Sequence, residues 1–172
     1  MTILYPTIGL LLVVLYIYCY NRLVSAKQNA QQALAGIDVQ LKRRSDLIPN
    51  LVQVVQGYAT HEKELFEHIA KMRTKALATP KNDVDNVSNV EHEIGTSLKS
   101  IIALSEAYPE LKANEQYLKL QSQLGETEDQ IASARRIYNS NVTDYNTMTA
   151  TFPLSIIAMI HGFTLLPLFQ NS

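Results

Sequence analysis

The sequence is poor in the residues that mark disulfide scaffolds and thiol enzymes. Its only cysteine, Cys19, lies inside an uncharged run near the N-terminus. A single cysteine cannot form a disulfide within the chain. The reactive form of cysteine is the thiolate, which an apolar environment disfavours. We therefore expect neither a disulfide framework nor a cysteine nucleophile.

Glycine is also scarce, and the charges nearly balance. The six glycines are scattered singly, so the chain has no glycine-rich phosphate loop. Lysine and arginine total 15 against 16 aspartates and glutamates, a balance that lacks the basic character of a nucleic-acid-binding domain. No serine stands in a strand-to-helix elbow of the hydrolase kind. The sequence predicts a protein that is not an enzyme, with no cofactor and no nucleic-acid partner.

What the sequence does contain is one long uncharged run at residues 3–20. As a helix this run would span about 27 Å, close to the hydrocarbon thickness of a bilayer. A cleaved signal peptide would need basic residues before the run and small residues at the cut, whereas bulky tyrosines occupy positions 16, 18 and 20. Lipoprotein processing at Cys19 is disfavoured because Tyr18 is large. We predict a retained transmembrane anchor over residues 1–20.

The positive charges next to the run indicate its orientation. Arg22 and Lys27 follow it, and no basic side chain precedes it. Positive charge is retained on the cytoplasmic side of membrane spans. We predict a single-pass protein of the cell inner (plasma) membrane with its bulk in the cytoplasm.

Beyond the anchor, the apolar residues recur at helical spacing, and no sustained alternation of period two competes. Four helices are predicted near residues 21–44, 47–76, 88–107 and 115–151, with a loop at residues 79–89. The last helix carries a coiled-coil-like seam of about five heptads. The predicted class is all-α: a transmembrane helix followed by an antiparallel up-and-down four-helix bundle over residues 21–152.

Pro49 predicts an interruption early in this bundle. Proline has no N–H, and its ring clashes with the carbonyl group four residues earlier, here that of Ser45. Ser45 or Asp46 can cap a new helix in which Pro49 falls in the tolerated first turn. We expect a break near residues 44–46 rather than a mere kink.

Two clusters of opposite charge fall at matching heights in the predicted bundle. From residue 22 to residue 44 a helix rises about 33 Å, and the descent from residue 129 to residue 151 covers about the same distance. We predict that the two clusters pair across the bundle and set its register. The clusters are Lys42, Arg43 and Arg44 on one side and Glu126, Glu128 and Asp129 on the other.

The segment around Pro49 also concentrates polar residues where a helical seam should be apolar. It can be interpreted as a docking tip that faces away from the membrane. The favoured interpretation is a helix break with Asp46 as the cap and Arg44 paired to an acid on a neighbouring helix, because a break requires those residue types anyway. The candidate interaction tip comprises Arg43, Arg44, Asp46, Pro49 and Asn50.

A second apolar stretch covers residues 154–169 and has no charged side chain. Gly162 and Pro167 divide it, and it is short for a membrane span. It can pack under the bundle, lie in the membrane interface or enter the membrane partway. We predict that residues 153–172 form an interfacial or bundle-packed segment rather than a second span.

His61, Glu64 and His68 share one helical face and suggest a metal site. A di-metal bundle needs a Glu-x-x-His motif on each of two helices, yet Leu65 stands three residues before His68. We therefore interpret this face as solvated and predict no metal ligands.

The seam of the last helix contains three tyrosines, and buried tyrosines need partners for their hydroxyl groups. Four asparagines can supply such partners, or the rings can form a contact surface for another protein. The tyrosines are Tyr117, Tyr138 and Tyr145, and the asparagines are Asn50, Asn114, Asn139 and Asn146.

Several segments in consistent order resemble the LemA family, over residues 20–169. The matching segments include YNRLV at residues 20–24, IDVQLKRRSDLIPNLV at 37–52, GYA at 57–59, EAYP at 106–109, ETED at 126–129 and FP at 152–153. One departure is Gln170, where an acidic residue often stands in the family. The resemblance implies a membrane-anchored helical bundle of poorly defined function, and it implies no active-site residues.

The anchor, a rigid helical body and the lack of catalytic motifs favour a non-catalytic scaffold or adaptor that binds other envelope proteins, including a membrane protease. The alternative is a self-assembling oligomer that shapes membranes as rings or arrays. A metal carrier or enzyme built in the bundle core is the least favoured of the three hypotheses.

Overall fold

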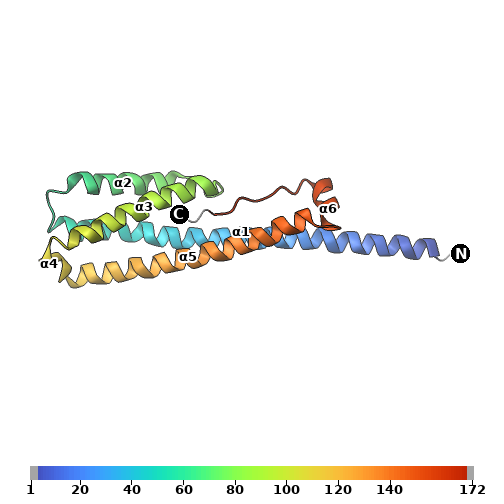
Figure 1. Ribbon diagram of the computed structural model, residues 1–172, viewed down its shortest axis with the longest axis horizontal. Coiled ribbons are helices and arrows are strands. Elements are labelled where there is room, and N and C mark those ends of the chain that lie inside the picture. The colour runs from blue at the N-terminus through green and yellow to red at the C-terminus, as the bar shows by residue number, and fades with distance from the viewer. Residues whose placement is uncertain (1–3, 170–172) are drawn as a thin grey trace. The chain divides into compact units, whose positions relative to one another are not determined.

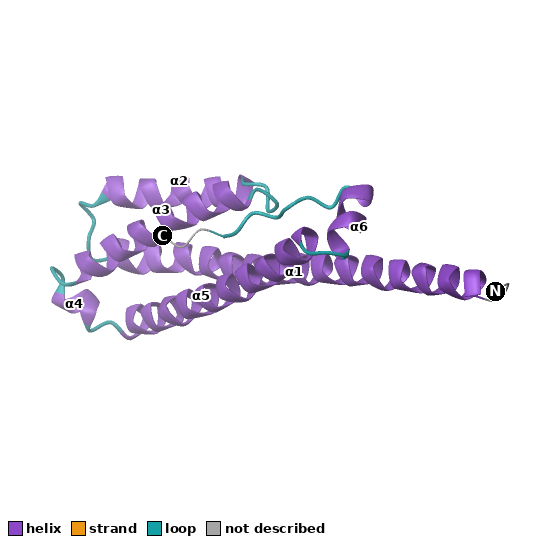
Figure 2. Cartoon of the chain, turned by 45° about the vertical axis from the view of Figure 1, so that its right-hand side comes forward, coloured by secondary structure: helices purple, strands orange, loops and turns teal. Residues whose placement is uncertain are grey.

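The computed structural model describes residues 4–169, and six α-helices account for most of this range (Figure 1). The all-α class is confirmed, and Figure 2 shows helices and loops but no strand in the described range. Residues 1–3 of the predicted anchor and residues 170–172, Gln170 among them, lie outside the described residues. The helices are α1 (Leu4–Gln56), α2 (Lys63–Ala78), α3 (Val84–Ser105), α4 (Pro109–Lys112), α5 (Glu115–Ala150) and α6 (Leu154–His161).

The chain folds into two compact units, and α1 and α5 each contribute to both. The described part of the first unit comprises residues 4–35 and 136–168. The described part of the second unit comprises residues 36–135 together with Phe169. The predicted four-helix bundle is not confirmed, since the described residues form six helices.

The first unit contains the apolar N-terminal part of α1. This helix is long and apolar enough to cross a membrane. The large apolar side chains from Leu10 to Ile17 are between 42% and 67% exposed, as lipid-facing residues are in the absence of lipid. The membrane-spanning character predicted for this region therefore has a matching helix.

α6 packs beside the end of that apolar stretch, in the same unit. Ile157 and Ala158 of α6 form a small buried cluster with Cys19 and Leu23 of α1. The left-handed backbone conformation of Gly162, with φ of 67°, ends α6, as glycine permits at a helix C-terminus. An extended segment, residues 163–168, follows it.

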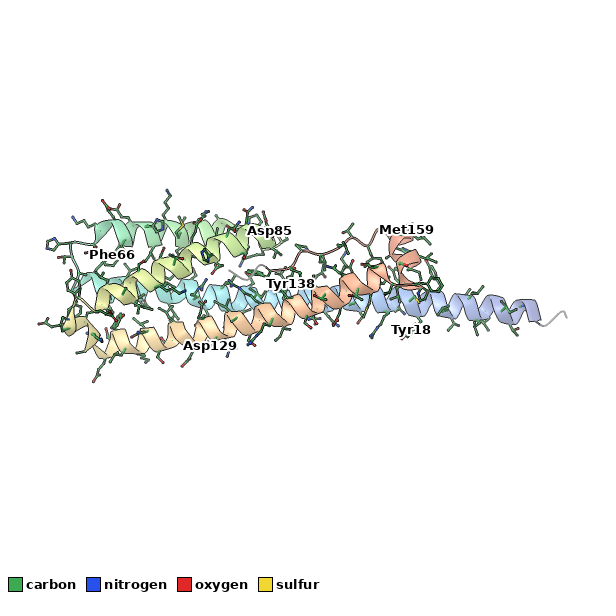
Figure 3. The ribbon with its side chains drawn as sticks, in the orientation of Figure 1. Tyr18, Phe66, Asp85, Asp129, Tyr138 and Met159 are labelled. Atoms are coloured by element: carbon green, nitrogen blue, oxygen red, sulfur yellow. The ribbon has the colours of Figure 1, made fainter. Side chains whose placement is uncertain are left out.

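The second unit is built on one hydrophobic core to which five helices contribute. Ile48 and Leu51 of α1, Phe66 of α2 and Ile101 of α3 are all at most 4% exposed, and Leu111 of the one-turn helix α4 is fully buried with them. Tyr117 and Leu124 add the α5 side of the core. Figure 1 shows α2 and α3 side by side, and Figure 3 labels Phe66 on α2.

The predicted break near residues 44–46 is wrong, because α1 continues through Pro49 to Gln56. Pro49 has no N–H to donate to the carbonyl group of Ser45, and this missing bond is the usual reason for a break. In the structure, Nε of Arg73 in α2 donates to that carbonyl oxygen at 3.0 Å. A tertiary hydrogen bond thus replaces the helical one, and the chain reverses only after Gln56.

The predicted loop at residues 79–89 is shorter than expected, because α3 already begins at Val84. Asp83 is the N-cap of α3, and its side chain accepts a hydrogen bond from the backbone N–H of Asn86 at 3.2 Å. The aspartate and asparagine residues that indicated a loop thus serve as helix cap and first turn.

Candidate interaction groove and buried ion cluster

A buried ion cluster joins three helices of the second unit. The Arg44 side chain of α1 is 2% exposed and pairs with the carboxylate of Glu91 in α3. Its Nη2 also donates to the backbone oxygen of Glu91 at 3.2 Å, and its Nη1 donates to Oε2 of Glu128 in α5 at 2.6 Å. One guanidinium group therefore ties α1 to both α3 and α5.

Burial controls the electrostatics of this cluster. Desolvation raises the pKa of the Glu91 carboxyl above its ordinary value, and the attraction of Arg44 only partly opposes the rise. Burial, followed by repulsion from Arg44, lowers the pKa of Arg135 on α5. The guanidinium carbon of Arg135 lies 4.7 Å from the centroid of the Phe169 ring, a cation–π contact.

The structure brings together part of the two predicted charge clusters. Arg44 contacts Glu128, and Nη2 of Arg43 lies 3.7 Å from Oε2 of Glu126 with both side chains near half exposure. Lys42 and Asp129 are exposed and make no ion pair within residues 4–169, and Figure 3 shows Asp129 on the outer side of α5. That these pairs set the helix register remains a prediction.

The five residues of the candidate tip lie inside α1 and not at its end. The Arg44 side chain is buried in the ion cluster, whereas Arg43, Asp46, Pro49 and Asn50 are exposed. Asp46 does not cap a helix, since α1 runs through it. A docking role for the four exposed residues stays a prediction.

Glu91 and Arg135 belong to the ion cluster but were not identified from the sequence. Glu91 falls on the stripe of α3 that also carries Ile94, Leu98 and Ile101, all buried. A carboxylate on a buried stripe needs a cationic partner. That position was the available signal, but the sequence did not indicate which arginine would supply the charge.

An open groove of about 650 Å³ lies between the last turns of α1 and the first turns of α5. Five of its lining residues carry side-chain amides, and one of these, Asn114, donates from Nδ2 to the Tyr58 hydroxyl at 3.0 Å. The other four amides make no side-chain hydrogen bond within the described part of the chain. The lining residues are Asn50, Gln53, Val54, Tyr58, Asn114, Gln116, Lys119, Leu120 and Gln123.

Two of the three seam tyrosines donate to backbone oxygens, whereas the buried hydroxyl group of Tyr117 makes no hydrogen bond within the described residues. Tyr138 donates to the backbone oxygen of Pro167 at 2.8 Å, and Tyr145 donates to that of Thr164 at 2.9 Å. Asn146 makes two hydrogen bonds with the backbone of Leu166. Its Nδ2 donates to the Leu166 oxygen at 3.0 Å, and its Oδ1 accepts from the Leu166 N–H at 2.9 Å. Within the first unit, hydroxyl and amide side chains of α5 thus hold an extended segment by its main chain.

The histidines and glutamates of α2 do not form a metal centre among the described residues, where no cluster of three potential ligands occurs. His61, Glu64 and His68 are all exposed. In the described part of the second unit, the carboxylates of Glu91 and Glu128 are engaged by Arg44. The site geometry thus offers a polar binding groove and a structural ion cluster.

Comparison with known proteins places the chain in a family. Residues 33–172 match the LemA family. The chain is 29% identical to the LemA protein of Metamycoplasma hominis, over 96% of this chain and 75% of that protein. It is 26% identical to the magnetosome protein MamQ 2 of Paramagnetospirillum magneticum, over 88% of this chain and 65% of the relative.

A third relative is the magnetosome protein MamQ of Magnetospirillum gryphiswaldense, which is 24% identical over 84% of this chain. The chain spans 62% to 65% of the length of these MamQ relatives. Because the family match covers most of the sequence and agrees with the helical structure and its apolar N-terminal helix, the chain belongs to the LemA family.

Proposed function

We propose that this protein is a membrane-anchored, non-catalytic adaptor whose helical body binds an extended, uncharged peptide segment of another envelope protein. The observation that carries the proposal is the amide-lined groove between α1 and α5 in the second unit. Asn50, from the candidate tip, is one of its lining residues.

The chemistry of the occupant follows from the lining. Side-chain amides offer a donor and an acceptor and can therefore pair with the N–H and C=O groups of an extended chain. The same chain shows this pairing in its first unit, where Asn146 pairs with both backbone groups of Leu166. Lys119 is the one charged residue in the groove lining, and Val54 and Leu120 offer apolar contact to uncharged side chains.

Site-specific photocrosslinking in the intact membrane tests this role. A crosslinker at Gln116, inside the groove, should capture a discrete envelope protein through an uncharged segment. Asn50→Leu combined with Gln123→Leu should abolish the capture without lowering the thermal stability. The matched control carries the crosslinker at Thr74, an exposed position of α2 outside the groove lining.

Capture of the same protein from Thr74, or through a highly charged segment, would contradict the groove as the binding site. A membrane protease is the partner that we place first among the candidates, because a tethered helical body can hold such an enzyme beside its substrates.

The adaptor is proposed to project into the cytoplasm from the cell inner (plasma) membrane. Arg22 and Lys27 follow the membrane helix, as positive charge does on the cytoplasmic side. A cysteine placed at the exposed Thr74 should react with a membrane-impermeant thiol reagent only after cell lysis. Cys19 is 2% exposed and so gives little background. Labelling of intact cells would reverse the assignment.

A self-assembling, membrane-shaping protein is the second candidate function. It is favoured by the exposed apolar side chains of α6, of which Met159 is 84% exposed. Imaging of the full-length protein in lipid would support this role if it showed rings or arrays. A uniform monomer that captures its partner through the groove would exclude self-assembly and support the adaptor role.

A further inference from the structure

α6 presents an apolar face to the outside of the first unit. One side of the helix, with Ile157 and Ala158, is buried against α1. On the other side Ile156, Met159 and Ile160 are 51%, 84% and 66% exposed. Phe152, which precedes the helix, is 80% exposed. A contiguous apolar surface of this kind indicates contact with lipid or protein.

The position of α6 along α1 shows which of these partners it meets. His161 Nε2 lies 2.5 Å from the Tyr16 hydroxyl, and the His161 ring lies 4.8 Å from that of Tyr20. The first charged residue after the uncharged run is Arg22. Tyrosines at the end of an apolar helix occupy the membrane–water interface. α6 therefore lies at the depth where α1 leaves the hydrocarbon.

The direction of α6 fits the same location. Figures 1 and 2 both show α6 running crosswise to α1. A helix that runs across a membrane span is roughly parallel to the membrane surface. No charged side chain occurs from residue 154 to residue 169, so no ionic group opposes insertion. Lys27 Nζ, 5.7 Å from the centroid of the Phe163 ring, supplies a cation close to this interface.

We propose that α6 is an interfacial helix that inserts into the single leaflet next to Tyr16 and Tyr20. Its ligand is the acyl-chain region of lipid, which Phe152, Ile156, Met159 and Ile160 contact. The exposed apolar surface of α1 and that of α6 meet at Tyr16 and His161, so one lipid phase covers both. The inference rests on the membrane helix and holds whether or not the groove binds a partner.

The absence of tryptophan from the sequence makes the test direct, because each introduced tryptophan is the sole reporter of its kind. Full-length Met159→Trp and Ile160→Trp variants are reconstituted in phosphatidylcholine–phosphatidylglycerol vesicles that contain lipids brominated either near the headgroup or near the chain end. Both reporters should emit at shorter wavelength than in water and be quenched several-fold more by the shallow bromines than by the deep ones.

Two further reporters serve as controls. Leu77→Trp on α2, where Leu77 is 55% exposed, should resist quenching by both lipids, and Val13→Trp in the membrane helix should be quenched by the deep bromines. Circular dichroism verifies that each variant keeps its helix content.

Quenching at positions 159 and 160 no stronger than at position 77 would overturn the proposal. Strongest quenching there by the deep bromines would do so as well, since it would place α6 deep in the hydrocarbon and not at the interface. A blue shift in detergent that grows with protein concentration would assign the face to a second copy. Absence of quenching at position 13 would show that this part of α1 does not lie in the membrane, and it would therefore contradict the proposal for α6 as well.

Discussion

Different polar contacts stabilise the interior of each of the two units of this chain. In the second unit, a buried guanidinium group, that of Arg44, binds Glu91 and Glu128 on two other helices. In the first unit, Tyr138, Tyr145 and Asn146 of α5 bind main-chain atoms of residues 164–167. The ion cluster requires particular partner side chains, whereas the backbone contacts require only a main chain in an extended conformation.

This difference determines how each unit responds to mutation. Removing one member of a buried ion pair leaves a desolvated charge, which is more destabilising than the loss of a neutral hydrogen bond. The second unit should therefore be sensitive to side-chain identity at a few positions. The first unit should tolerate changes in the bound segment but not in the α5 residues that hold it.

The largest effect is expected for Arg44→Ala, which leaves the Glu91 carboxylate buried without its partner. The free energy of unfolding should fall by about 3–5 kcal/mol, measured by chemical denaturation of the full-length protein in detergent. Arg43→Ala is the matched control, since Arg43 forms only an exposed pair and its removal should cost at most about 1 kcal/mol. Equal losses in the two variants would show that burial does not govern the cluster.

The next effect concerns Arg73, whose Nε replaces the hydrogen bond that Pro49 cannot make. Arg73→Ala should lower the free energy of unfolding by about 1–3 kcal/mol, because the Ser45 carbonyl group then lacks a donor. In a Pro49→Ala background the residue 49 N–H can donate to that carbonyl, so Arg73→Ala should cost less. A double-mutant cycle measures this coupling, and a coupling of zero would disprove the compensation.

In the first unit, Asn146→Ala removes both hydrogen bonds to Leu166. We expect the free energy that holds residues 164–167 against α5 to fall by about 1–3 kcal/mol. Amide hydrogen exchange should accelerate at residues 164–166 and stay unchanged in α2; Pro167 has no N–H to exchange. Asn141→Ala, which removes one exposed bond to the Asn29 carbonyl, is the control and should have little effect.

Leu166→Ala sharpens the same test, because it keeps the main chain that Asn146 binds. Amide hydrogen exchange at residues 164–166 should change far less than in Asn146→Ala. Comparable acceleration would mean that the Leu166 side chain, and not its backbone, holds the segment.

The pH dependence of stability offers a smaller effect, specific to the ion cluster. The folded state raises the pKa of Glu91 above its ordinary value of 4.5, so it binds this proton more tightly than the unfolded state does. The resulting stability is fully present below pH 4.5 and is lost as the pH rises through the raised folded pKa. The thermal unfolding temperature should therefore decrease less steeply with pH in this interval for Glu91→Gln than for the wild type. If the unfolding temperatures of the two proteins changed in parallel with pH, a group other than Glu91 would be responsible for the pH dependence.

The smallest effect is expected at the exposed pair of Arg43 and Glu126, which tests the predicted role in register. Arg43→Glu should cost about 0–1 kcal/mol, and adding Glu126→Arg should recover part of that loss. Chemical denaturation of the two single variants and the double variant gives the coupling. Purely additive losses would remove this pair from any role in register.

Much of the fold could be predicted from local pattern. Residues 4–20 of the uncharged run form the start of α1, and the bounds predicted for the last long helix agree with α5 to within a residue or two. The break at Pro49 was predicted wrongly, because the donor that repairs it, Arg73, lies on another helix. The loop at residues 79–89 was overestimated, because Asp83 and its neighbours favour a helix start as well as a loop.

The candidate site was less accessible to sequence reasoning. Matching helix rises, a local calculation, predict that the cluster of Lys42, Arg43 and Arg44 lies level with that of Glu126, Glu128 and Asp129, but they assign no individual pair. Glu91 was not part of this prediction, although its side chain is the partner buried most deeply with that of Arg44. The groove was not predicted, although the sequence singles out two of its lining residues, Asn50 and Asn114, because the lining combines residues 50–58 with residues 114–123.

The sequence alone determined the apolar helix, the all-α class and the polarity of each segment, since these follow from the composition and period of neighbouring residues. Only the tertiary structure decided that α1 passes through Pro49, that Arg44 binds Glu91, and that α5 tyrosines bind the backbone of residues 164–167. Each of these contacts joins groups far apart in the chain. The free energy of such a contact depends on burial and mutual geometry, which no local window of sequence contains.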